Sequence, residues 1–353
     1  MILQWAESDR DNDEHFLTAR KNDQQYTSET RGRFARLLGR PVGFMPQSSP
    51  GSVGIQVATD AYALRHHAAE TLVRLTAALS QRTNTVELGV WEALSTGPNQ
   101  LDHVVRQICE FFASKEARMQ FARLVLREQD LQNGMTDERA SLCRVFAAWV
   151  QVAIDLLRGE ELHLNAAHNK IKHGLSVRAR DDLKVTFVRT LPSEDGTIPV
   201  GALTGPDVLD IFDQPVIEVL AQAPKVDGHK QGLELTQLRV DVAAVLAETY
   251  MIAWTHAAMF HVAASKHFEG RVDLPDYLAP PDYPGLPTSD LHPEHVSGDA
   301  PLGMRFPLTT PPGGGFAKRS AGLALRNSFL PFEIIDAKPR KLHVVADEAA
   351  EET

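Results

Sequence analysis

Residues 133–157 read NGMTDERASLCRVFAAWVQVAIDLL, and this stretch carries the clearest secondary-structure signal in the chain. The pair Asn133-Gly134 is typical of a helix C-terminus, and Thr136 is a good N-cap for a helix that follows. Beyond the cap, apolar residues recur at helical spacing, which predicts an amphipathic helix with one buried face. The residues of that face are Leu142, Val145, Phe146, Trp149, Val152, Ala153, Leu156 and Leu157.

The same periodicity extends along the chain on both sides of this stretch. Gly159 interrupts the pattern before it resumes, and Gly174 ends it. The further predicted helices cover about 55–82, 99–113, 115–130, 160–173 and 234–268. Between the last two, KVTFVRT (184–190) is typical of a strand and is followed by a stretch rich in turn residues.

We therefore expect a mainly α fold, a helical bundle over 55–271 with a small strand-containing insertion at about 175–232. Residues 1–54 are polar and irregular. The remainder, 272–353, is rich in proline and glycine as far as 315 and ends in an acidic tail. It predicts an irregular C-terminal arm with one short strand near 323–335.

Composition limits the classes of protein to consider. The chain has 353 residues, a formal net charge of −10 and two cysteines, Cys109 and Cys143, which we expect to be buried thiols. The charge argues against nonspecific coating of nucleic acid, although a local basic site stays open. The N-terminus has no signal-peptide pattern, and no apolar run suggests a membrane span. We expect a cytoplasmic protein that does not contact a membrane.

Polar and basic residues gather in 165–180, NAAHNKIKHGLSVRAR, where the helical pattern ends. Asn169 and His173 are four residues apart and share one helix face. A histidine there can act as general acid or base on a ribose 2′-hydroxyl, and nearby cations can stabilise the charged phosphate in the transition state. The pattern predicts metal-independent RNA cleavage or RNA binding. The cations are Lys170, Lys172, Arg178 and Arg180.

The run His168-Asn169-Lys170-Ile171-Lys172-His173 resembles the signature of the HEPN superfamily, in which an Arg and a polar residue precede a His. Members are helical-bundle RNases, toxins and defence proteins, and many inactive members serve as binding or dimerisation modules. The resemblance implies that His173 is the acid or base, that Asn169 positions the substrate and that His168 stands where the family has Arg. It implies RNA contacts by the four cations, a site formed between two protomers, and no metal or cofactor.

Two other interpretations stay open. The same lysines, His173 and Gly174 suit any helix C-terminus, because cations complement the helix dipole and glycine adopts the left-handed cap. The chain would then be a catalytically inactive scaffold or assembly subunit that binds a protein partner or a second copy through 234–268 and 272–315. Glu160 and His163 have the spacing of a di-iron ligand pair, but the sequence has no second copy, so we expect no metal site.

Overall fold

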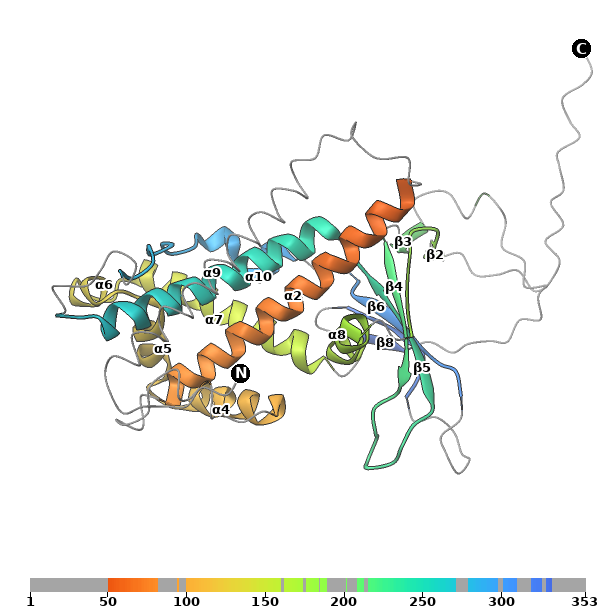
Figure 1. Ribbon diagram of the computed structural model, residues 1–353, viewed down its shortest axis with the longest axis horizontal. Helices are drawn as coiled ribbons and strands as arrows, with labels where there is room; N and C mark the ends of the chain where they lie inside the picture. Colours follow the sequence, from red (N-terminus) through yellow and green to blue (C-terminus); the bar gives the residue numbers. More distant parts are fainter. Residues whose placement is uncertain are drawn as a thin grey trace, which may run out of the picture.

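The computed structural model of the chain sets a layer of helices beside a six-stranded antiparallel sheet (Figure 1). The structure describes residues between 50 and 331 with gaps, and the statements below concern those residues. They are 50–81, 94, 100–159, 162–173, 176–183, 185–188, 201, 208–212, 215–270, 279–297, 301–309, 319–325 and 328–331. The expectations for an irregular N-terminal segment and an acidic tail lie outside the described residues.

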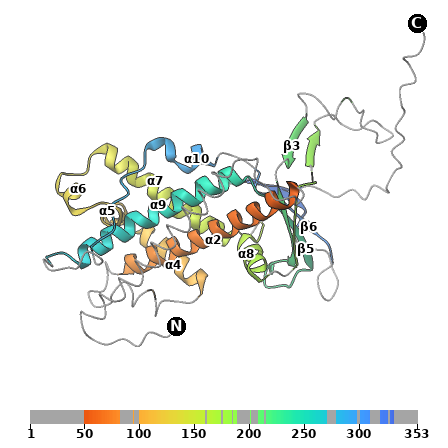
Figure 2. The same ribbon diagram turned by 45° about the horizontal axis from the view of Figure 1, so that its top comes forward.

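Three long helices form the centre of the helical layer, and α2 packs against the other two (Figures 1 and 2). They are α2 (Pro50–Gln81), α7 (Asp137–Arg158) and α9 (Val242–His267). Shorter helices surround them: α4 (Leu101–Ala113), α5 (Ala117–Val125), α6 (Glu128–Gln132) and α8 (Leu164–His173). The bulky side chains of Tyr62, Phe146 and Trp149 are almost fully buried among them, so one core holds this layer together.

Local capping explains several helix boundaries. The hydroxyl of Thr136 accepts a hydrogen bond from the amide of Arg139 at 3.2 Å, which confirms the predicted N-cap. Gly134, just before it, has a φ of 86°, a conformation that favours glycine. The carboxylate of Asp241 caps α9 by accepting from the amide of Ala244 at 3.1 Å. Each cap satisfies a backbone donor that the first helical turn leaves unpaired.

The sheet runs in the order β1–β4–β5–β6–β7–β8, and every neighbouring pair is antiparallel. Its strands are β1 (Val177–Arg180), β4 (Val216–Gln222), β5 (Leu233–Arg239), β6 (Gly303–Pro307), β7 (Gly322–Ala324) and β8 (Phe329–Pro331). A separate antiparallel ribbon consists of β2 (Val185–Val188) and β3 (Val208–Phe212), so the strand expected at 184–190 is present.

The expectation of a mainly α fold with a small strand-containing insertion is wrong. The helices do form a bundle, but a six-stranded sheet stands beside it and takes strands from both the insertion and the C-terminal part. The predicted start of the long helix at 234 is also wrong, because Leu233–Arg239 is strand β5. Burial alternates between successive residues in the first part of β5, as expected for a strand. The helical periodicity of the residues that follow made this short alternation hard to recognise in the sequence.

The two faces of the sheet have different surroundings. Ile217 and Leu238 are paired across β4 and β5 and belong to the core shared with the helices. Side chains alternate along a strand, so Val216 points the other way. There it joins Phe212 and Met304 in a second, smaller core between the sheet and the β2–β3 ribbon. We call the side away from the helices the outer face.

The proline-rich arm is not irregular throughout, because residues 279–297 lie along the helices as an ordered strap with a short helix, α10 (Pro293–Val296). Indole N–H groups hold its backbone: Trp149 donates to the carbonyl of Leu291 at 2.9 Å, and Trp254 to that of Gly285 at 3.0 Å. Proline-rich backbone has carbonyls that no internal hydrogen bond satisfies, so these donors fit it well.

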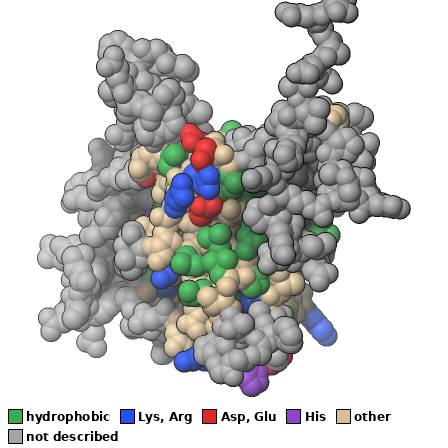
Figure 3. Space-filling view, turned by 90° about the vertical axis from the view of Figure 1, so that its right-hand side faces the viewer, with side chains coloured by type: hydrophobic (Ala, Val, Ile, Leu, Met, Phe, Trp, Pro, Cys, Tyr) green, Lys and Arg blue, Asp and Glu red, His purple; other side chains and the backbone are tan. Residues whose placement is uncertain are grey.

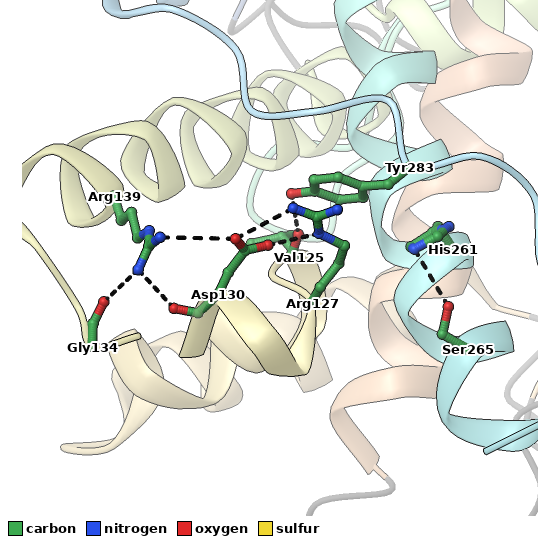
Figure 4. A network of polar contacts seen from close by, with 8 residues as sticks. All are labelled: Val125, Arg127, Asp130, Gly134, Arg139, His261, Ser265 and Tyr283. Atoms are coloured by element: carbon green, nitrogen blue, oxygen red, sulfur yellow. Dashed lines mark hydrogen bonds and ion pairs between the residues drawn. The ribbon is translucent and has the colours of Figure 1, made fainter. Parts of the chain in front are cut away.

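A polar network fixes the start of the strap (Figure 4). Tyr283 donates to the carbonyl of Val125 at 2.8 Å, and the guanidinium of Arg127 lies 4.9 Å from the Tyr283 ring centre. Arg127 and Arg139 both approach the carboxylate of Asp130, at 2.8 and 3.8 Å. The strap, α6 and α7 are thereby joined, so the C-terminal arm is part of the folded core.

Helix α7 is, among the described helices, the one long and apolar enough to cross a membrane by length and composition. It packs against α2, α5, α8 and α9, and its Trp149 is fully buried. These contacts are those of a helix that packs in a protein core. The cysteines differ from each other: Cys143 is buried as expected, whereas Cys109 is exposed, and neither forms a disulfide.

Candidate functional site

Helix α8 carries the polar motif and is set against the core by its first turn. His163 has a φ of 51°, so the chain turns sharply between α7 and α8. Leu162, Leu164 and Ala167 are buried, and the Tyr62 hydroxyl donates to the carbonyl of Leu164 at 3.1 Å. These contacts place α8 against α2 and α7 on one side and β1 and β4 on the other.

His168 points from α8 toward α2 rather than toward open solvent. Its ring stacks on that of His66, with centroids 5.3 Å apart and planes 11° apart. His66 is fully buried, and its Nδ1 lies 3.1 Å from the carbonyl of Tyr62. Burial, with the positive charge of Arg65 as a smaller cause, lowers the pKa of His66 well below its usual value. His168 therefore packs on a neutral ring.

A buried ion pair adjoins these histidines. The Arg65 guanidinium donates to the Glu248 carboxylate at 2.7 Å, and the two side chains are 7% and 4% exposed. Arg65 also lies 5.3 Å from the centre of the Tyr62 ring. Burial raises the pKa of the Tyr62 hydroxyl, which stays protonated and donates. The sequence analysis did not identify this cluster. Tyr62 and Arg65 are nevertheless at helical spacing from the buried residues Ala58 and Ala69, which places all four on one face of α2.

Among the motif residues whose side chains the structure describes, Asn169 differs from His168 in its exposure. Asn169 is exposed, as expected from a helix in which successive residues differ by about 100°. Lys170 is half-buried. The backbone of His173 completes α8, but the side chains of Lys172 and His173 lie outside the described residues. The described part of the site thus separates His168, half-buried against His66, from Asn169, which is exposed.

Arg178 and Arg180 lie on the outer face of the sheet, away from α8. The intervening Ala179 packs on the helical core, so its neighbours point to the opposite side. Arg180 contacts Asp182 at 2.6 Å and Glu218 at 3.5 Å, and its hydrogen bond lowers the pKa of the exposed Asp182 carboxyl. These arginines and Lys170 therefore do not form one basic surface, and acidic groups offset part of the charge.

The outer face also carries an apolar patch beside these charges (Figure 3). Strand alternation and cross-strand pairing place six large apolar side chains on it. The members of this patch are Leu220, Leu233, Leu235, Phe306, Leu308 and Leu330. Three are strongly exposed: Leu308 at 55%, Leu330 at 52% and Leu233 at 42%. Exposed apolar side chains gathered on one face are typical of a binding surface.

The described residues contain no group that could hold a metal ion, and the chain matches no known family model. Among the described residues, no group of three or more His, Cys, Asp or Glu side chains could hold a metal ion. Comparison with known proteins gives no matching family model, no matching curated protein and no matching solved structure. The resemblance to HEPN proteins therefore rests on the motif in α8 alone.

Proposed function

We propose that the chain is a non-catalytic assembly subunit that pairs with a second copy of itself through the outer face of its sheet. One observation carries this proposal. Of the five large apolar side chains that are exposed in the described part of the chain, three belong to the apolar patch, namely Leu233, Leu308 and Leu330. Burying such side chains on association contributes about 25 cal/mol per Å² of apolar surface removed from water.

The charges beside the patch favour a second copy as the occupant. Arg178 and Arg180 lie next to Asp182 and Glu218, so both signs stand on the same rim. In a two-fold dimer the same surface faces itself, and an apolar centre then meets an apolar centre. The charged residues around the patch are of both signs. When two copies meet, positive side chains of one can therefore lie opposite negative side chains of the other. A strongly basic or acidic partner would match only half of these groups.

The position of His168 supports a role without catalysis. In HEPN-like RNases the motif's first residue is an arginine that acts on the phosphate, whereas this chain has a histidine stacked on the buried His66. A half-buried imidazole stacked on another ring cannot hold a phosphate as a guanidinium does. If the resemblance is real, it points to the members that serve as dimerisation modules. We place the protein in a reducing compartment such as the cytoplasm, because its two cysteines are unpaired.

The test is the oligomeric state of the full chain, measured by light scattering and analytical ultracentrifugation over a range of concentrations. We expect a dimer for the wild type and a monomer for Leu233→Glu/Leu308→Glu, because two carboxylates would enter the apolar patch. Met119→Glu is the matched control, since Met119 is 47% exposed on α5, away from the sheet. All three proteins should melt alike. A wild type that stays monomeric at high concentration refutes the proposal.

An RNA assay in EDTA separates this proposal from RNA cleavage. We expect no cleavage by the wild type, by His173→Ala or by His168→Arg. Cleavage by the wild type that leaves 2′,3′-cyclic phosphate ends and is lost in His173→Ala would instead establish a metal-independent RNase. Cleavage by His168→Arg alone would mean that the site is a degenerate nuclease site, and the new arginine would have to turn away from His66 toward the RNA.

A further inference from the structure

Helices α2 and α9 end on the side of the helical layer that is farthest from the sheet (Figure 1). A half-open cavity of about 330 Å³ lies between residues of α2, α5 and α9 near these ends. Its volume is at the lower end of the range of about 300–1,000 Å³ that small-molecule sites occupy. It is lined by Leu79, Arg123, Leu124, Met259, Val262, Ala263, Lys266 and His267.

The walls and the rim of this cavity differ in chemistry. All five apolar lining residues are buried, Met259 completely and Val262 to within 3%. Among the described lining residues, the three polar ones, Arg123, Lys266 and His267, are all basic, and none is acidic. This contrasts with the whole chain, whose net charge is −10. A ligand that fits must combine an aliphatic part with an anionic group.

The position of these basic residues at helix ends explains part of the positive charge, but it does not explain the cavity. Arg123 lies in the last turn of α5, and Lys266 and His267 lie in that of α9, where cations complement the helix dipole. The Lys266 ammonium donates to the carbonyl of Arg123 at 2.9 Å, which joins the two helix ends. The Arg123 guanidinium has no hydrogen bond or ion pair to any other described residue. A carboxylate at the rim would give it a bidentate partner.

We propose that this cavity binds an aliphatic carboxylate of medium chain length, with its carboxylate on Arg123 and its alkyl chain against Met259 and Val262. The alkyl chain gains by leaving water, and each further buried CH₂ tightens binding about fourfold. The carboxylate stays at the rim, where the charges of Arg123 and Lys266 outweigh the carbonyl ends of α5 and α9. This site goes beyond the assembly function and shares no residue with the apolar patch.

The experiment is isothermal titration of the full chain with decanoate, octanoate and decylamine. We expect decanoate to bind at one site, octanoate to bind about fifteenfold more weakly because it has two CH₂ groups fewer, and decylamine not to bind. Arg123→Ala should weaken decanoate binding about tenfold or more, the loss expected for a charge-assisted hydrogen bond. Arg118→Ala is the control, because Arg118 is exposed on the same helix and does not line the cavity.

A second variant tests the wall rather than the rim. Ala263→Leu places a larger side chain in the cavity and should abolish decanoate binding, with the melting temperature showing whether the protein still folds. Arg123 is exposed, so its substitution keeps the test informative if Ala263→Leu does not fold. Three results would overturn the proposal: no decanoate binding to the wild type, equal binding of decylamine, or the same affinity in Arg123→Ala and Arg118→Ala.

Discussion

The histidine at position 168 shows what a motif can and cannot reveal at the scale of one residue. Its spacing from Asn169 and His173 is readable in the sequence, and so is its place in the helix. The sequence does not show which side chain His168 contacts, because that side chain belongs to His66, about a hundred residues earlier in the chain. Only the packing of α8 on α2 brings the two rings together. The motif therefore resembles a surface cluster in the sequence, although its first residue is half-buried against a core histidine.

His66 should make the stability of the protein depend on pH. Its pKa is lowered in the folded state by burial, whereas in the unfolded chain it is near 6.5. Below that pH the unfolded state takes up a proton that the folded state refuses, so the free energy of unfolding falls as the pH falls. Urea unfolding at pH 7.5 and 5.5 should show a loss about 1 kcal/mol larger in the wild type than in His66→Phe.

The exposed neighbour His67 provides the control for this measurement. His67→Asn should keep the pH dependence of the wild type, because the substitution is at an exposed position and leaves His66 buried. Equal pH dependence in His66→Phe and the wild type would mean that His66 accepts its proton in the folded protein.

At the scale of elements, α2 and α9 are joined by the Arg65–Glu248 ion pair. Both side chains are almost fully buried, so removing one leaves the other charged and without its partner in the core. Glu248→Gln should lower the free energy of unfolding by about 3–5 kcal/mol in urea titrations. The double variant Arg65→Met/Glu248→Leu should recover most of that loss. A loss below about 1 kcal/mol in Glu248→Gln would show that solvent reaches the pair.

The strap should loosen when its indole donors are removed. Trp254→Phe deletes the N–H that bonds to the carbonyl of Gly285 and keeps most of the ring. Amide hydrogen exchange in 285–297 should then be about fivefold faster, as expected for the loss of roughly 1 kcal/mol. Tyr250→Phe on the same helix is the control, since Tyr250 is 54% exposed. Unchanged exchange in Trp254→Phe would mean that apolar contacts alone hold the strap.

Over the whole molecule, the sequence predicted the helices better than the sheet, for a physical reason. The helices of 137–158 and 101–113 are decided by local periodicity and caps, which lie within each segment. The sheet is decided by pairing between distant segments: β5 at 233–239 is completed by β6 at 303–307, beyond the proline-rich arm. The strands β7 and β8 have three residues each, too few to show a period. The cavity and the apolar patch depend on tertiary packing and could not be predicted.

The two proposed sites should act independently, because the helical layer separates them and no residue belongs to both. Substitutions at distant sites without shared partners usually have additive effects. We therefore expect Leu233→Glu/Leu308→Glu to bind decanoate as the wild type does, and Arg123→Ala to form a dimer of unchanged Kd. Saturating decanoate should likewise leave the dimer Kd within about twofold, measured by ultracentrifugation. If decanoate did shift the dimer Kd, linkage requires dimerisation to change the decanoate affinity by the same factor. A matched pair of shifts would contradict independence and would make α2 and α9, which join the two ends, the first elements to examine.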